Sequence, residues 1–111
     1  MVIVFKTSRV EELCNDDRLA IRKLGAVCAA KLRTRLDDLK HAPSLDAVPI
    51  HARCHPLKGN QAGLLAITVH AGYRLVFQPH HDPIPMKSDG GLDLRNVTCV
   101  CVVSVEDYHH G

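Results

Sequence analysis

Three groups of polar residues adjoin apolar, strand-like segments of this sequence, and they are its candidates for chemistry. The first is a basic stretch in which polar and apolar residues alternate before a glycine-containing loop; it contains His51, Arg53, His55 and Lys58. The second is Asp107-Tyr108-His109, directly after the last apolar segment. The third is Arg74, alone within Tyr73-Arg74-Leu75-Val76-Phe77. A charge inside such a strand is costly unless it is paired or lies on an open face.

This combination of imidazole, amine, guanidinium and phenol groups suits the cleavage of RNA without a metal. The reaction must remove a proton from a ribose 2′-hydroxyl, stabilise a pentavalent phosphate and protonate the leaving 5′-oxygen. Positioned acids and bases typically contribute about 10²–10⁴-fold to such steps, and preorganised cations contribute comparably. His109 is a candidate general acid because an imidazole titrates near neutrality.

Other kinds of site lack their signatures. None of the serines lies in a G-x-S-x-G turn, and no glycine-rich phosphate loop leads into a helix. Asp37 and Asp38 are neighbours on an expected helix, so they point apart. His51-x-x-Cys54-His55 is followed by no second zinc knuckle, and Cys99-x-Cys101 suits buried thiol packing. The sequence therefore predicts neither a metal nor a cofactor.

Length and composition favour one small globular domain over residues 1–111. The formal net charge is +2 with eight histidines counted as neutral, which permits nucleic-acid binding but is not diagnostic of it. Five cysteines, an odd number, together with an N-terminus unlike a signal peptide, predict a reduced cytoplasmic protein. No segment approaches the roughly 20 apolar residues of a membrane span, so no membrane association is expected.

The periodicity of apolar residues predicts the order of elements. A strand is expected over residues 2–5, then a short helix capped by Thr7 or Ser8, and then a long helix over 17–40. The apolar stripe of that long helix consists of Ile21, Leu24, Cys28, Leu32, Leu36 and Leu39. Further strands are expected over 51–58, 64–70, 73–78 and 97–105. Residues 79–96, with three prolines, are expected to form a long inserted loop.

Helices that precede the strands imply an α+β fold, in which two N-terminal helices pack on one face of a small, mainly antiparallel sheet. The other face of the sheet would stay open and could carry a site.

At this point the sequence resembles a known group of proteins. The segment from His55-Pro56-Leu57-Lys58-Gly59 to Tyr73-Arg74-Leu75-x-Phe77, together with the terminal Val105-Glu106-Asp107-Tyr108-His109, is similar to the HigB-like branch of the RelE/ParE toxin superfamily, the plasmid maintenance system killers. The loop from Asp82 to Asp93 is similar to a longer-loop subset that is sometimes labelled killer suppression protein.

The resemblance implies a RelE-like fold and ribosome-dependent mRNA cleavage. The partners it implies are a HigA-like helix-turn-helix antitoxin, the ribosome and mRNA. Matching positions imply that Lys58 and Arg74 hold the phosphate and that His109 is the general acid. Arg53, in the basic stretch, is a further candidate for binding RNA. Tyr108 would stack on or orient the nucleotide, and Asp107 would orient a neighbour or accept a proton. The general base stays open among His55, Lys58 and Asp107.

Several alternatives stand beside this interpretation. On the same fold the chain could inhibit DNA gyrase without catalysis, as the ParE branch does, or act as a regulatory binding module. His55 and Lys58 could be solvated strand-end residues. Tyr108 could be a plug in the core, and His109 and His110 could be a frayed tail. Arg74 could pair with Asp107 or Glu106, a role that would be compatible with binding phosphate.

Overall fold

The computed structural model describes residues 1–49 and 54–107. The predictions that concern His51, Arg53, Tyr108 and His109 therefore lie outside the described residues.

A short strand and three helices form the N-terminal part. Strand β1 (Val2–Phe5) is followed by α1 (Ser8–Asn15), α2 (Asp17–Leu24) and α3 (Ala26–His41). The Thr7 hydroxyl caps α1 by accepting the Val10 N–H at 3.2 Å, and the Asp16 carboxylate caps α2 by accepting the Leu19 N–H at 3.2 Å. These caps satisfy backbone donors that have no partner within a helix, so the two short helices begin where the sequence predicts.

The expected continuous helix over 17–40 is wrong, because the chain breaks at Gly25. This glycine has φ +87° and ψ 158°, a conformation that is open almost only to glycine. Helices α2 and α3 are therefore separate elements, and Ile21, predicted to be buried, is 48% exposed. Cys28, Leu32 and Leu39 on α3 are buried as predicted.

The sheet has five strands in the order β1-β5-β4-β3-β2. Its other strands are β2 (His55–Pro56), β3 (Leu65–His70), β4 (Tyr73–Pro79) and β5 (Cys99–Asp107). Strand β1 runs parallel to β5 and all other pairs are antiparallel, which confirms the α+β class and the mainly antiparallel sheet. The strand expected over 51–58 is reduced, within the described residues, to His55 and Pro56.

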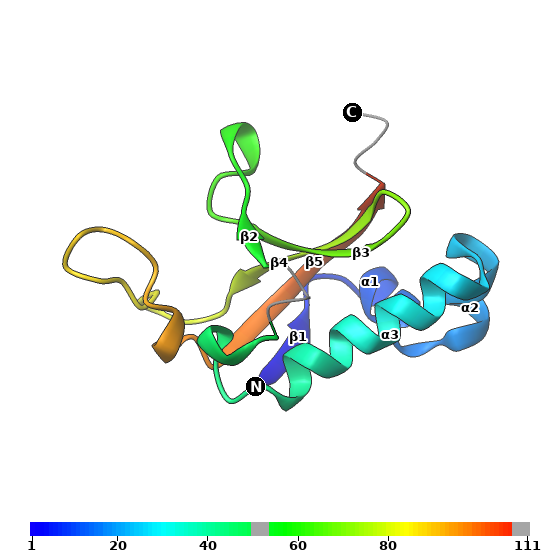
Figure 1. Ribbon diagram of the computed structural model, residues 1–111, viewed down its shortest axis with the longest axis horizontal. Coiled ribbons are helices and arrows are strands. Elements are labelled where there is room, and N and C mark those ends of the chain that lie inside the picture. The colour runs from blue at the N-terminus through cyan, green and yellow to red at the C-terminus, as the bar shows by residue number, and fades with distance from the viewer. Residues whose placement is uncertain (50–53, 108–111) are drawn as a thin grey trace.

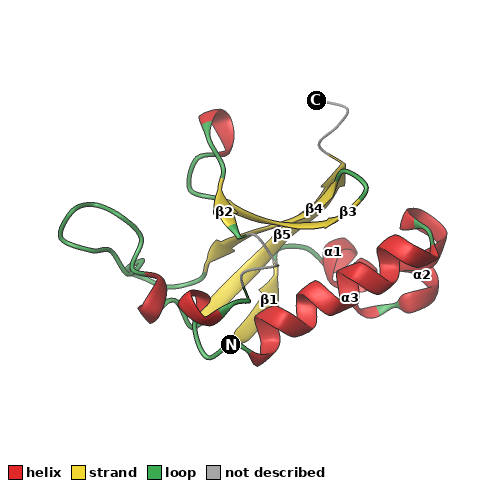
Figure 2. Ribbon diagram, in the orientation of Figure 1, coloured by secondary structure: helices red, strands yellow, loops and turns green. Residues whose placement is uncertain are grey.

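All three helices lie along one side of the sheet, and the turn between β2 and β3 rises on the other side (Figure 1; coloured by element type in Figure 2). Strand alternation follows this division, since Leu75 and Phe77 on β4 join the core cluster that includes Leu32 and Leu39 of α3. Arg74 and Gln78 alternate with them and belong to the opposite face. That face is the one left for a site.

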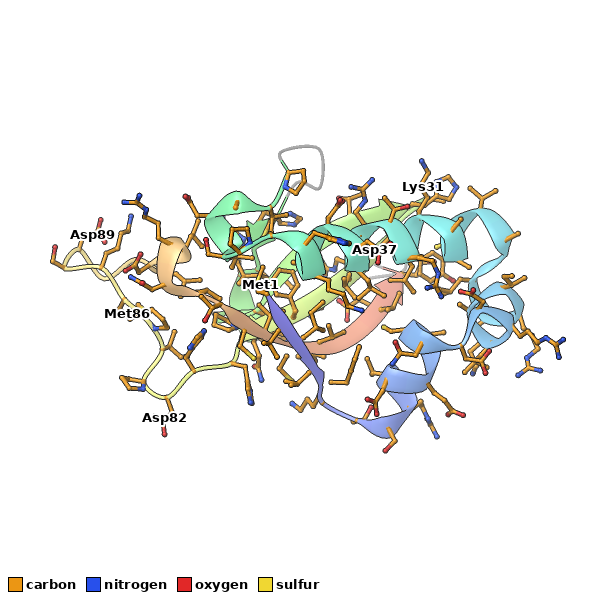
Figure 3. All side chains as sticks on the ribbon, turned by 90° about the horizontal axis from the view of Figure 1, so that it is seen from below. Met1, Lys31, Asp37, Asp82, Met86 and Asp89 are labelled. Atoms are coloured by element: carbon orange, nitrogen blue, oxygen red, sulfur yellow. The ribbon has the colours of Figure 1, made fainter. Side chains whose placement is uncertain are left out.

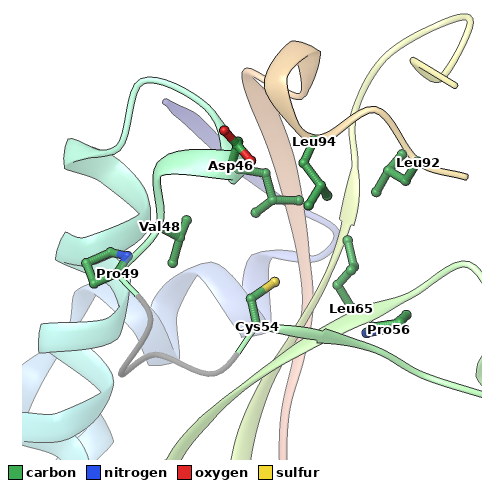
Figure 4. Close-up of a pocket in the computed structure, with 9 residues that line it drawn as sticks. Asp46, Val48, Pro49, Cys54, Pro56, Leu65, Leu92 and Leu94 are labelled. Atoms are coloured by element: carbon green, nitrogen blue, oxygen red, sulfur yellow. The ribbon is translucent and has the colours of Figure 1, made fainter. Parts of the chain in front are cut away.

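Residues 80–98 form the expected long connection between β4 and β5. Its regular structure is a 3₁₀ turn, Leu94–Asn96, and an isolated bridge between Met86 and Leu92. Figure 3 shows the connection extending away from the sheet, with Asp82, Met86 and Asp89 along it. Where it returns, Leu92 and Leu94 border an almost wholly apolar cavity of about 480 Å³ (Figure 4), in which Asp46 is the charged lining residue. Among the described residues, this lining offers few groups for acid–base chemistry.

None of the helices within residues 1–49 and 54–107 is long and apolar enough to cross a membrane.

Candidate functional site

The register of the sheet lines up polar side chains on the open face. Thr68 of β3, Arg74 of β4 and Glu106 of β5 are direct cross-strand partners and form one row. The next row begins at His55 of β2 and ends at Ser104 of β5. Partners in a row share a face of the sheet, so His55, Arg74 and Glu106 lie on the same surface.

Arg74 and Glu106 form the centre of this surface. The guanidinium donates to Glu106 Oε1 from Nε at 3.1 Å and from Nη2 at 2.8 Å. The two side chains are only 16% and 33% exposed. The sequence left open whether Arg74 pairs with Glu106 or with Asp107; the pair with Glu106 is confirmed, while Asp107 lies opposite Tyr73, one position further along.

The turn between β2 and β3 is tied to this ion pair by Gln61. The Gln61 side-chain Oε1 accepts from Arg74 Nη2 at 3.1 Å, and its Nε2 donates to Glu106 Oε1 at 3.2 Å. Lys58 precedes the 3₁₀ turn Gly59–Gln61, and its carbonyl accepts the Gln61 N–H at 3.3 Å. Gln61 thereby holds the backbone that carries the exposed Lys58 against the Arg74 cluster.

Glu106 is held as a carboxylate by this network. Partial burial raises its pKa, but hydrogen bonds from Arg74, Gln61 and Ser104 lower it and outweigh burial, so the pKa lies below its ordinary value of 4.5. The Ser104 hydroxyl donates to Glu106 Oε2 at 3.1 Å. A carboxylate with this many donors is a poor proton acceptor, which makes Glu106 a group that positions Arg74.

The lowered pKa predicts how stability depends on pH. Because the folded state favours the charged form of Glu106, its contribution is fully present above the unfolded-state pKa, near 4.5, and is lost as pH falls through the lower folded-state pKa. Urea unfolding should show Glu106→Gln to be less stable than the wild type at pH 7, by about 1 kcal/mol. That difference should shrink below about pH 4.5.

The exposed Glu12→Gln on α1 is the matched control, since it also removes one negative charge. A gap between wild type and Glu106→Gln that stays constant from pH 7 to pH 3 would contradict the assignment.

Most of the predicted site residues that the structure describes lie on or beside the open face. His55 and Arg74 share the open face, and Lys58 lies on the turn that contacts Arg74. Asp107 ends β5 beside Glu106. Gln61 and Ser104 were missed. Ser104 and Glu106 could have been noticed as polar residues two apart in an apolar strand, whereas Gln61 has no comparable sequence signal.

The thiols are not activated. Burial raises the pKa of Cys14 and of Cys54 to about 11, so both thiols are protonated at neutral pH and are poor nucleophiles. All five cysteines are unpaired. Within the described part of the chain, no three His, Cys, Asp or Glu side chains are placed to hold a metal ion together.

Comparison with known proteins adds one result. No protein-family model matches the sequence, and no curated protein matches it. Among solved structures, one described as a YoeB/ParE toxin from Agrobacterium tumefaciens is similar, with a TM-score of 0.56 and 18% sequence identity over 96% of this chain and 98% of that chain. The chain therefore has the fold of a YoeB/ParE toxin.

Proposed function

We propose that this chain is the toxin of a type II toxin–antitoxin system, a metal-free endoribonuclease that cuts mRNA on the ribosome. The observation that carries the proposal is the arrangement of Arg74. Its largely buried guanidinium is fixed by Glu106 and Gln61 on the open face of the sheet, and Gln61 belongs to the same turn as Lys58. Fold alone does not determine function, so these side chains are what supports a catalytic role.

Lys58 and Arg74 are the proposed phosphate-binding pair. Attack of the ribose 2′-oxygen on phosphorus builds negative charge on the phosphate oxygens, and the bond to the 5′-oxygen breaks to leave a cyclic phosphate. Cations that are already in place stabilise this charge without reorganising. Arg74 is held in this way by its partners, while Lys58 is exposed and can reach substrate.

The proton transfers are assigned from the sequence. His109 is proposed to protonate the leaving 5′-oxygen, and Tyr108 to orient the nucleotide. The base that takes the 2′-hydroxyl proton is one of His55, Lys58 and Asp107, and Arg53 is proposed to add a contact to RNA. Asp107 directly precedes Tyr108 in the sequence and adjoins Glu106 at the end of β5.

The proposed partners follow from this role. A toxin of this kind acts in the cytoplasm, on mRNA in the ribosome, and must be held inactive by an antitoxin. We propose a HigA-like helix-turn-helix protein for that inhibitor. Growth arrest by the chain should therefore be suppressed when such an antitoxin is expressed together with it.

The decisive experiment compares growth arrest on induced expression for wild type, Lys58→Ala and His109→Ala, with cleavage of mRNA on purified ribosomes measured alongside. Each substitution should lower the cleavage rate by about 10²-fold and relieve the arrest. Lys31→Ala is the matched control, because Lys31 is also an exposed lysine but lies on α3, on the helix side of the sheet (Figure 3).

Wild-type protein that neither arrests growth nor cleaves ribosome-bound mRNA would overturn the proposal. The similar structure is described as a YoeB/ParE toxin, so gyrase inhibition, the alternative taken from the ParE branch, is the rival function to test. Arrest that persists in both variants, with inhibition of DNA supercoiling by the purified protein, would favour a non-enzymatic gyrase inhibitor.

A further inference from the structure

A second cavity lies at the other end of β4 from the Arg74 cluster. Its volume is about 390 Å³, and its lining comprises Gly63, Gln78, residues 79–82 and Ile84. Gly63 belongs to the same turn as Gln61. Gln78 follows Arg74 on β4 by four residues, which places it on the same face about 13 Å further along the strand. The cavity and the Arg74 cluster therefore flank the same turn between β2 and β3.

His81 is fixed in the wall of this cavity by the backbone of the following strand. Its Nε2 accepts the N–H groups of Thr98 at 3.1 Å and of Cys99 at 3.3 Å. A nitrogen that accepts hydrogen bonds carries no proton, so the neutral ring has its proton on Nδ1 and keeps one donor. The N–H of His80 donates to the Cys99 carbonyl at 2.9 Å, which anchors the start of the 80–98 connection as well.

The polar groups of the lining include both donors and acceptors. A glutamine amide offers one of each, an imidazole N–H is a donor and a carboxylate is an acceptor, and Gln78, His81 and Asp82 all belong to the lining. The exposed His80 ring and Ile84, which is 46% exposed, add flat and apolar surface. The carboxylate makes the cavity unfavourable for a phosphate, whereas a flat heterocycle with donor and acceptor edges matches this lining.

Single-stranded RNA is recognised by proteins in this way, with a base stacked on a ring and hydrogen-bonded at its edge. We propose that this cavity binds one unpaired RNA base, a short distance along the RNA chain from the phosphate held at Arg74, and thereby sets a base preference. This inference rests on the proposed function. It assigns a role to the start of the 80–98 connection, which the proposed cleavage chemistry does not use.

The test measures binding to the isolated protein, so it does not depend on the ribosome. Fluorescence anisotropy would give the affinities of 5′-fluorescein-labelled hexamers of adenylate, cytidylate and uridylate. A base-reading contact predicts that the best and worst hexamers differ by about tenfold in affinity for the wild-type protein. His80→Ala and Gln78→Ala should each reduce that difference to about twofold. His80 is exposed, so its variant leaves the core intact.

Lys87→Ala is the control, since Lys87 is exposed in the same connection but does not line the cavity. It should retain the base preference. Equal affinities for the three hexamers in the wild type, or a preference that survives both cavity variants, would overturn the inference. Ribosome-dependent cleavage is measured separately: normal cleavage without base preference contradicts only this inference, and base preference without cleavage contradicts only the proposed function.

Discussion

Arg74→Ala is expected to lower mRNA cleavage by about 10²–10³-fold and to relieve growth arrest, because it removes a preorganised donor to the charged phosphate. It should also lower the free energy of unfolding by about 1–2 kcal/mol. Glu106 would lose the charged partner that offsets its partial burial, and Gln61 would lose one of its anchors. Urea unfolding and the rate of cleavage on ribosomes measure the two effects separately.

Two further variants separate the charge of Arg74 from its geometry. Arg74→Lys keeps the positive charge but cannot reproduce the forked contacts with Glu106 and Gln61, so cleavage should fall between wild type and Arg74→Ala. A double-mutant cycle of Arg74→Ala and Glu106→Gln should give a coupling energy of about 1 kcal/mol.

Arg33→Ala controls for the loss of an ion-paired arginine. Arg33 pairs with Asp17 on the helix side of the sheet and is 51% exposed, so its loss should cost less than about 0.5 kcal/mol and leave cleavage unchanged. Cleavage at the wild-type rate by folded Arg74→Ala would remove Arg74 from the chemistry.

The outline of the fold could be predicted from the sequence because the sheet has two unlike faces. In β4, Leu75 and Phe77 point to the helices. Arg74 and Gln78 lie on the other face together with the buried Val76, so polar residues at even positions indicate both the strand and its open face. The break at Gly25 could not be predicted in the same way. Leu24 and Cys28 keep helical spacing across the break. The spacing of apolar residues therefore gives no sign that the backbone at Gly25 has φ +87°.

Arg74 and its possible acidic partners were predictable, but the pairing and the contribution of Gln61 were not. An arginine in an apolar strand indicates a partner, and Glu106 and Asp107, neighbours at the end of the last strand, could each serve. Choosing between them requires the register of β4 against β5, because a slip of one residue exchanges the faces of all side chains. The pairing contains an irregularity between Val76 and Phe77, a local feature with no sequence pattern.

Phe77→Ala is expected to have the largest effect on stability, about 3–5 kcal/mol in the free energy of unfolding. Phe77 is 0% exposed and lies between Leu65 on β3 and Val102 on β5, so its loss opens a cavity among central strands. The chain has two Phe, two Tyr and no Trp, and no other large ring belongs to the fully buried set in the described structure. A loss of this size is a large part of the 5–15 kcal/mol that stabilises a typical domain.

Phe77→Leu should cost less than about 1.5 kcal/mol, because it conserves most of the buried volume, and Val2→Ala, at a position 61% exposed, should change stability by less than about 0.5 kcal/mol. Urea unfolding of the three variants provides the comparison. Phe77→Ala should also relieve growth arrest, but through loss of folded protein, whereas Arg74→Ala should relieve it while remaining soluble and folded. If the free energy of unfolding of Phe77→Ala lies within about 1 kcal/mol of the wild-type value, Phe77 is not a central part of the core.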